Sequence, residues 1–247
     1  NDGLNFKIYT AANASYADIQ SGNLDISQNV PTSALKTFTK DPKVNSYSKA
    51  SSGIAAFTIP SNLEHFTGEE GVLRRQAISM ALDRKQITEK VLSGTATPVT
   101  DFAAPTISGH SDKLKGSENL EYNPKKAKEL WAKADAISKF TGTFTLSYNA
   151  DGDAKSLYDA MANQLKNNLG IDAATNPVPT FQEFRDEVTK RQLKGGVKGG
   201  WQADYPTIEN YLAPIYATSA ADGHGANDGD YKNPKFDALL DEAAKAS

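Results

Sequence analysis

The stretch Gly200-Trp201-Gln202-Ala203-Asp204-Tyr205-Pro206, which follows a glycine-rich run, is the most informative part of this sequence. Pro206 fixes its own φ and biases Tyr205 towards an extended conformation, so a strand that reaches this point must end here. Glycines allow another backbone to approach closely. The stretch therefore predicts a strand end that is open to a guest chain. Trp201 would be its stacking surface and Asp204 a fixed negative charge suited to an ammonium group.

A structural interpretation of the same residues stays open at this point. A tryptophan at a strand end more often joins the core than faces a ligand, and an aspartate before a turn is often only a capping residue. Short motifs also match by chance. The rest of the chain therefore has to decide between binding and packing.

Length and composition indicate a globular protein with one large domain or two small ones. The chain has 247 residues, of which 38% are hydrophobic and 23% charged, and its net charge is −3. Positive and negative residues are intermixed, without a basic stripe. Because clustered lysines and arginines supply most of the affinity for duplex nucleic acid, no nucleic-acid partner is expected.

The two ends of the sequence look truncated. The chain opens directly into Leu4–Tyr9, which alternates like a strand in progress, and it closes in the helical pattern Asp241–Ser247. No apolar run is long enough to span a bilayer, and no targeting segment is evident. There is no cysteine, so disulfide and thiolate chemistry are excluded.

Apolar residues at helical spacing, combined with capping residues, predict a series of amphipathic helices. The predicted start signals are Asp83 with Gln86, Asn123–Pro124, Thr180 with Glu183, and Asn233–Pro234. The stripes expected to face the core are Leu73, Ala77, Met80 and Ala81; Ala127, Leu130, Trp131 and Ala134; Leu157, Met161, Leu165 and Leu169; Phe181, Phe184 and Val188; and Phe236, Leu239, Leu240 and Ala243.

Shorter segments with strand character alternate with these helices. The predicted strands are Phe6–Thr10, Ile54–Ile59, Thr143–Tyr148, Ile171–Val178 and Val197–Gln202. This alternation indicates an α/β fold in which helices pack on a sheet. The segment Gly94–Leu120 has little periodicity, and we expect it to wrap the surface as an ordered loop.

No arrangement of residues in the sequence points to catalysis or to metal binding. His65, His110 and His224 lie far apart, and we expect exposed loop positions for them. The acidic turns Asp151–Asp153 and Asn227–Asp230 lack the glycine and glutamate spacing of a calcium loop. The glycine-rich run lacks the ending of a phosphate loop, and no Gly-x-Ser-x-Gly elbow is present. We therefore expect neither an enzyme nor a cofactor.

Several distinctive segments follow one another in a characteristic order. They are Tyr16–Ile26, Ala56–Thr58, Leu73–Arg84, Val91–Pro98, Tyr122–Ala127, Gly200–Pro206 and Tyr231–Asp237. The series resembles the family 5 extracellular solute-binding proteins, which are the dipeptide, oligopeptide and nickel receptors of ABC importers. The resemblance covers nearly the whole chain, from about Tyr9 onwards.

This resemblance implies a fold, a location and a set of partners. The fold would be α/β, one lobe of a periplasmic-binding-protein type II fold with a mixed sheet flanked by helices. Residues 1–247 would form a single ligand-binding lobe, the distal one, without the N-terminal lobe and the final return segment. The whole protein would be a monomeric bacterial lipoprotein outside the cytoplasm, held by a lipid anchor on the missing part, and it would deliver its solute to permease subunits.

The resemblance also implies roles for individual residues. In peptide-binding members the aspartate of the tryptophan-centred motif pairs with the α-ammonium of the peptide, which assigns that role to Asp204. Trp201 would shape a side-chain pocket, and the backbones of Gly200 and Gln202 would extend the peptide as an added strand. Tyr205 completes the expected ligand-binding site.

The class of ligand stays open, because the same motif occurs in members that do not bind peptides. An oligosaccharide could stack on Trp201, Tyr205 and Tyr211, and a metal chelate is the other alternative within this fold. An enzyme would need a nucleophile and base pairing, which the sequence motifs do not supply. A purely structural adhesion module would leave the series of motifs unexplained.

Overall fold

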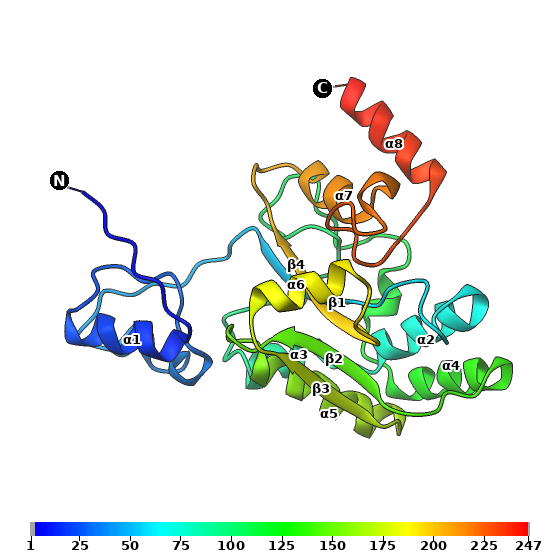
Figure 1. The fold of residues 1–247 in the computed structure, drawn as a ribbon, viewed down its shortest axis with the longest axis horizontal. Coiled ribbons are helices and arrows are strands. Elements are labelled where there is room, and N and C mark those ends of the chain that lie inside the picture. The colour runs from blue at the N-terminus through cyan, green and yellow to red at the C-terminus, as the bar shows by residue number, and fades with distance from the viewer. Residues whose placement is uncertain (1–2, 247) are drawn as a thin grey trace.

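The computed structural model describes residues 3–246 as a mixed α/β structure built on a four-stranded sheet (Figure 1). The strands are β1 (Gly53–Thr58), β2 (Phe144–Asn149), β3 (Ala173–Val178) and β4 (Gly196–Gln202). The helices are α1 (Ala12–Ser21), α2 (Gly68–Met80), α3 (Arg84–Lys90), α4 (Pro124–Ile137), α5 (Lys155–Leu169), α6 (Phe181–Thr189), α7 (Glu209–Tyr216) and α8 (Pro234–Lys245), together with the short 3₁₀ turns η1 (Thr32–Ala34), η2 (Phe38–Lys40), η3 (Ser117–Leu120) and η4 (Thr218–Ala220).

The sheet has the order β1-β4-β2-β3 and is mixed, as predicted. Strand β4 is antiparallel to β1 and parallel to β2, while β2 and β3 are parallel. Four of the five predicted strands are found, each within two residues of its predicted bounds. Their alternation with long helices is the pattern that parallel connections require, because the chain must cross over to begin a neighbouring parallel strand.

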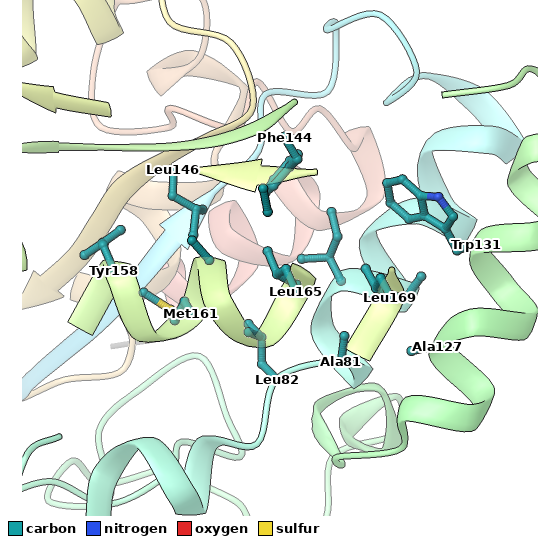
Figure 2. Packing of buried hydrophobic residues seen from close by; sticks show 14 of the residues in the cluster. Ala81, Leu82, Ala127, Trp131, Phe144, Leu146, Tyr158, Met161, Leu165 and Leu169 are labelled. Carbon is teal, nitrogen blue, oxygen red and sulfur yellow. The ribbon is translucent and has the colours of Figure 1, made fainter. Parts of the chain in front are cut away.

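The main core lies between one face of the sheet and the helices α2, α4 and α5. Figure 2 shows this packing, in which residues of β2 meet residues of α5. The residues labelled there are Ala81, Leu82, Ala127, Trp131, Phe144, Leu146, Tyr158, Met161, Leu165 and Leu169. A second cluster, with Phe184 and Val188 of α6, packs around Val197. Val197 pairs with Ser147, so its side chain lies on the face of the sheet opposite to that of Leu146. Helix α6 therefore covers the face that the main core leaves open.

The predicted caps are the ones the structure uses. The side chain of Asp83 accepts from the amide of Gln86, and Thr180 accepts from the amide of Glu183. Asn123 and Asn233 cap α4 and α8 ahead of a proline. These side chains satisfy amide groups that lack a partner within the helix, which explains why the helix starts could be read from the sequence.

The predicted strand Phe6–Thr10 is wrong. This segment is extended but pairs with no strand among the described residues, and Leu4, Phe6 and Ile8 are 88%, 86% and 93% exposed. Lys7 and Tyr9 instead bond to Asp18 of α1. The alternation supplies an apolar face, but a strand also needs a neighbour that completes its backbone hydrogen bonds.

The segment that contains α1 lies beside the sheet-containing body and joins it through an extended linker (Figure 1). The hydrogen bonds seen between residues 3–50 and residues 53–246 run from the backbone amide and hydroxyl of Thr32 to the carboxylate of Asp153, both at 2.6 Å. On the body side of the linker, the Tyr211 hydroxyl donates to the carbonyl of Ser52. The linker is therefore fixed to α7 where it enters β1.

Two predicted apolar faces are not buried as expected. No residue of α8 is buried, and Leu239 is 63% exposed. Phe181 is 54% exposed because it is the first residue of α6, where its side chain lies beyond the covered stripe of Phe184 and Val188. Among the described helices, none combines the length and apolar character needed to cross a bilayer.

The predicted surface loop Gly94–Leu120 is ordered and contributes to the core. Ala103, Ala104 and Ile107 are buried in a third cluster with Tyr211, against which Trp201 is partly buried. This loop therefore forms the support behind the tryptophan at the end of β4.

His110 fastens this loop and is not the exposed residue that the sequence predicts. Its side chain is only 10% exposed, its Nδ1 lies 2.9 Å from the carbonyl of Ala103, and its Nε2 lies 3.1 Å from Asp112. Asp101 is the other charged group facing it, 3.6 Å away. Burial alone would lower the pKa of His110, but the bonds to Asp112 and Ala103 and the charge of Asp101 raise it above its ordinary value. His65 is also shielded, 2.7 Å from Glu70, whereas His224 is exposed.

Replacing Gly195 with alanine should destabilise the fold much more than the same change at Gly170. Both residues have positive φ, of 78° and 74°, which costs an alanine about 1–2 kcal/mol. Only at Gly195 would the new Cβ also meet a backbone atom, the carbonyl oxygen of Thr145, at 2.2 Å. We expect a loss of about 3 kcal/mol or more for Gly195→Ala in urea unfolding. Equal losses for the two variants would contradict this packing.

The contribution of His110 to stability should fall as the pH rises. Its pKa is raised by folding, so the stabilisation is complete below the unfolded value of about 6.5 and is lost as the pH passes the higher folded value. We expect the difference in melting temperature between the native chain and His110→Gln to be larger at pH 5.5 than at pH 8.5 in thermal unfolding. The exposed His224→Gln is the control. A difference for His110→Gln that does not change with pH would contradict the ion-paired arrangement.

Candidate ligand-binding site

Strand β4 has a free edge next to the predicted site. It pairs with β1 from Val197 to Gln202, but its pairing with β2 covers only Gly196 and Val197. Beyond Val197 the two parallel strands part, so residues 198–202 have no described strand on that side. In an antiparallel pair, alternate residues direct their N–H and C=O groups away from the partner. The backbone of residues 198–202 therefore offers hydrogen-bonding groups to an incoming chain.

Gly200 lets β4 run close to β1 at this point. Its φ is 143°, and a Cβ added there would lie 2.4 Å from the carbonyl oxygen of Ile54. Only glycine fits such a contact without a shift of the backbone. Gln202, the last residue of the strand, is level with Gly53 and is exposed.

Trp201 and Asp204 are held by the same side chain. The Oδ1 atom of Asn210, in the first turn of α7, accepts from the Trp201 indole Nε1 at 3.1 Å and from the Asp204 backbone amide at 2.8 Å. Asn210 itself is 4% exposed. The turn that follows β4 is therefore closed by a buried amide. One side of Trp201 rests on the third cluster, which leaves the residue partly buried.

The carboxylate of Asp204 is left free by this arrangement. Asp204 is exposed, and among the described residues its side chain accepts no hydrogen bond and forms no ion pair. Most carboxylates nearby are engaged, as Glu209 is by the Tyr205 hydroxyl at 2.6 Å. An unpaired carboxylate beside an open strand edge is suited to accept a charge-assisted hydrogen bond from a cationic group.

Tyr205 lies next to Asp204 with its ring partly in solvent. It is 48% exposed, and its hydroxyl donates to Glu209. The bond to Glu209 raises the pKa of Tyr205, and the Asn210 side chain partly offsets that effect. Tyr205 is therefore tied to the first turn of α7 through Glu209.

Lys198 provides a positive charge at the other end of the free edge. Its Nζ atom donates to Asn149 Oδ1 at 2.6 Å and lies 6.0 Å from the ring centre of Phe181. Burial lowers the pKa of this lysine, and the charge of Asp151 partly offsets that effect. The ammonium group thus occupies the space where β2 and β4 part.

The structure brings the five predicted residues together at one strand end, but two important neighbours were not predicted. Lys198 carried a signal, since it is the one charged residue within the run Gly195–Gly200. Asn210 carried none, because an asparagine in the first turn of a helix looks like an ordinary local hydrogen-bonding residue. Its contact with Trp201 depends on the path of the turn between them.

The site is an open edge rather than an enclosed pocket. A cavity of about 450 Å³ lies elsewhere, between the N-terminal segment and the loop Asp151–Asp153 after β2, and none of the five predicted residues lines it. Within residues 3–246, no group of three or more His, Cys, Asp or Glu side chains is placed to hold a metal ion. The groups at the site suit recognition through backbone, charge and aromatic contacts.

Comparisons with known proteins agree on one family. Residues 1–223 match the family described as bacterial extracellular solute-binding proteins, family 5 middle. The chain is 28% identical over 247 residues to heme-binding protein A of Haemophilus influenzae, covering 98% of this chain and 43% of that protein. It is 25% identical over 251 residues to oligopeptide-binding protein OppA of Bacillus subtilis, covering 98% of this chain and 42% of that protein.

Solved structures show the same fold. The periplasmic binding protein DppA of Helicobacter pylori, in complex with the peptide STSA, matches with a TM-score of 0.81 at 20% identity, covering 94% of this chain and 43% of that chain. The chain thus spans less than half the length of these relatives. With the mixed sheet and its helices, this establishes the predicted periplasmic-binding-protein fold. The chain belongs to the family 5 bacterial extracellular solute-binding proteins, and it is a binding protein and not an enzyme.

Proposed function

We propose that this chain is the peptide-binding lobe of a receptor that captures oligopeptides outside the cytoplasm and delivers them to an ABC importer. The observation that carries the proposal is the free edge of β4 beside the unpaired carboxylate of Asp204. A peptide is the ligand that needs both features at once. Its main chain can extend a sheet by one strand, and its first residue carries an ammonium group.

In this proposal the peptide lies along residues 198–202 with its amino end at Asp204. Because β4 runs towards Asp204, the bound peptide would be antiparallel to β4. The charge-assisted hydrogen bond between the peptide ammonium and Asp204 would contribute about 1.5–3 kcal/mol. Main-chain bonds to Gly200 and Gln202 would supply affinity without regard to sequence, while Trp201 and Tyr205 would border a side-chain position.

Lys198 would meet the other end of the peptide. Four steps along a strand, from Lys198 to Gln202, span about 13 Å, a length comparable with a short extended peptide. A carboxylate at that end could pair with the Lys198 ammonium, which at present is satisfied by the neutral oxygen of Asn149. Two opposite charges at the two ends of one edge would favour short peptides with both termini free.

The remaining parts of the proposal concern the whole protein. Residues 1–247 would form the distal lobe, and a second lobe would close over the ligand about a hinge. The closed form would be the one that permease subunits recognise. The whole protein would act as a monomer, anchored to the outer face of the membrane by a lipid on its N-terminal part. Support comes from the family match and from the share of the relatives' length that this chain covers.

A flat ligand such as a porphyrin, a sugar or a metal chelate is the second candidate. It is favoured by the two aromatic residues at the site, Trp201 and the half-exposed Tyr205, and by the name of the relative heme-binding protein A. In that case stacking rather than the strand edge would supply the affinity. Haemin is therefore a necessary comparison ligand for any peptide-binding test.

Replacing Asp204 with asparagine in the full-length protein should weaken trialanine by about tenfold or more, since the ammonium would lose its charged partner. N-acetyl-trialanine, which lacks that ammonium, should be affected much less. Titration calorimetry with both peptides, and with haemin, measures the difference. An equal loss for both peptides would remove the ammonium role of Asp204, and tight binding of haemin without binding of trialanine would favour the second candidate.

The Lys198→Gln substitution should have the complementary effect. It removes the ammonium but keeps a side chain that can hydrogen-bond to Asn149, so the fold should be little changed. We expect trialanine to bind about threefold to tenfold more weakly, while trialanine amide, which lacks the carboxylate, should bind as it does to the native protein. Competition against a fluorescent peptide can measure both. A similar loss for both ligands would show that Lys198 does not recognise the carboxylate.

A further inference from the structure

Asn210 joins two of the residues that the sequence predicted for the site. Its Oδ1 atom accepts two hydrogen bonds, from the indole of Trp201 and from the backbone amide of Asp204. A carbonyl oxygen has two lone pairs, so this acceptor is fully used. Tyr205 is held separately in the same turn of α7, where its hydroxyl donates to Glu209.

We propose that Asn210 is the positioning residue of this site, because its single buried amide fixes Trp201 and the Asp204 backbone in one arrangement before a ligand arrives. Asn210 does not touch the ligand in this account. It acts through the two residues that would, Trp201 and Asp204, and its effect on affinity rests on the proposed peptide-binding function.

The burial of Asn210 gives this role its physical basis. At 4% exposure, the amide is shielded from water that could replace its hydrogen bonds. If Asn210 is lost, the backbone amide of Asp204 loses its partner, and the turn between β4 and α7 loses the side chain that ties Trp201 to Asp204. The carboxylate of Asp204 and the face of Trp201 would then sample several orientations. Ordering them again on binding would reduce the affinity.

The same amide also accounts for the free carboxylate of Asp204. In many turns an aspartate bonds to nearby backbone amides through its own side chain. Here the amide of Asp204 is already bonded to Asn210, and the carboxylate remains available at the surface. Asn210 thereby closes the turn, and the carboxylate of Asp204 stays available for a cation.

The test compares Asn210→Ala with Asn227→Ala in the full-length protein. Asn227 is a matched control: it is 1% exposed and its side chain makes three hydrogen bonds, to Ala217 and Tyr231, outside the site. Hydrogen exchange measured by NMR without ligand reports the order of the Trp201 indole and of the Asp204 amide. The indole of Trp131, in the main core, serves as an internal reference.

We expect Asn210→Ala to speed exchange at the Trp201 indole and at the Asp204 amide by about tenfold or more while Trp131 is unchanged, since loss of a local bond exposes only its own donors. Asn227→Ala should leave both signals unchanged. Asn210→Asp keeps an oxygen at the acceptor position and should restore slow exchange. In calorimetry, trialanine should bind Asn210→Ala about tenfold more weakly and Asn227→Ala normally.

Each of the other outcomes overturns the proposal in a recognisable way. Unchanged exchange at Trp201 and Asp204 in Asn210→Ala, or faster exchange that includes Trp131, would show that Asn210 does not order the site specifically. Faster local exchange with unchanged trialanine affinity would show that the ordering has no role in binding. If the native protein binds no trialanine, the proposed function fails, and the exchange measurements still decide whether Asn210 orders the site.

Discussion

Strand β4 is bonded to β1 along its length but loses its bonds to β2 after Val197, and the candidate site depends on this unequal pairing. A strand with partners on both edges would have no main-chain groups left for a ligand. A strand with none would not hold its shape. Gly200 makes the close contact with β1 possible, and Lys198 reaches Asn149 across the space where β2 departs. The sheet therefore ends in a rigid half-paired edge, which is the geometry that strand addition requires.

Helix α7 connects this edge to the rest of the molecule through two neighbouring residues. Asn210 closes the turn that carries Trp201 and Asp204, and Tyr211 bonds to the carbonyl of Ser52 at the entrance to β1. Tyr211 also packs in the cluster that supports Trp201. The first turn of α7 thus joins the residues of the candidate site to the point where the linker from the N-terminal segment enters the sheet.

Features controlled by neighbouring residues could be predicted from the sequence. The capping side chains of Asp83 and Thr180 and the strand that ends at Gln202 are local patterns, and the structure contains them. Features that need a distant partner could not. The alternation of Phe6–Thr10 has no described strand beside it, and the apolar face of α8 is covered only in part, where Phe236 packs against Tyr231. The sequence predicts an exposed position for His110, because its partners, Asp101 and Asp112, approach it only when the loop folds. The family resemblance predicted the candidate site, whereas the contacts of Asn210 became visible only in three dimensions.

The measurement that tests the central claim most directly is native mass spectrometry of the full-length protein as purified, followed by sequencing of whatever is released on denaturation. A receptor that reads the main chain through a half-paired strand should release peptides of mixed sequence and narrow length, because the edge of β4 fixes the extent of the bound chain but few of its side chains. Release of a single non-peptide mass would contradict the account, because such a ligand would not extend the sheet along the backbone of residues 198–202.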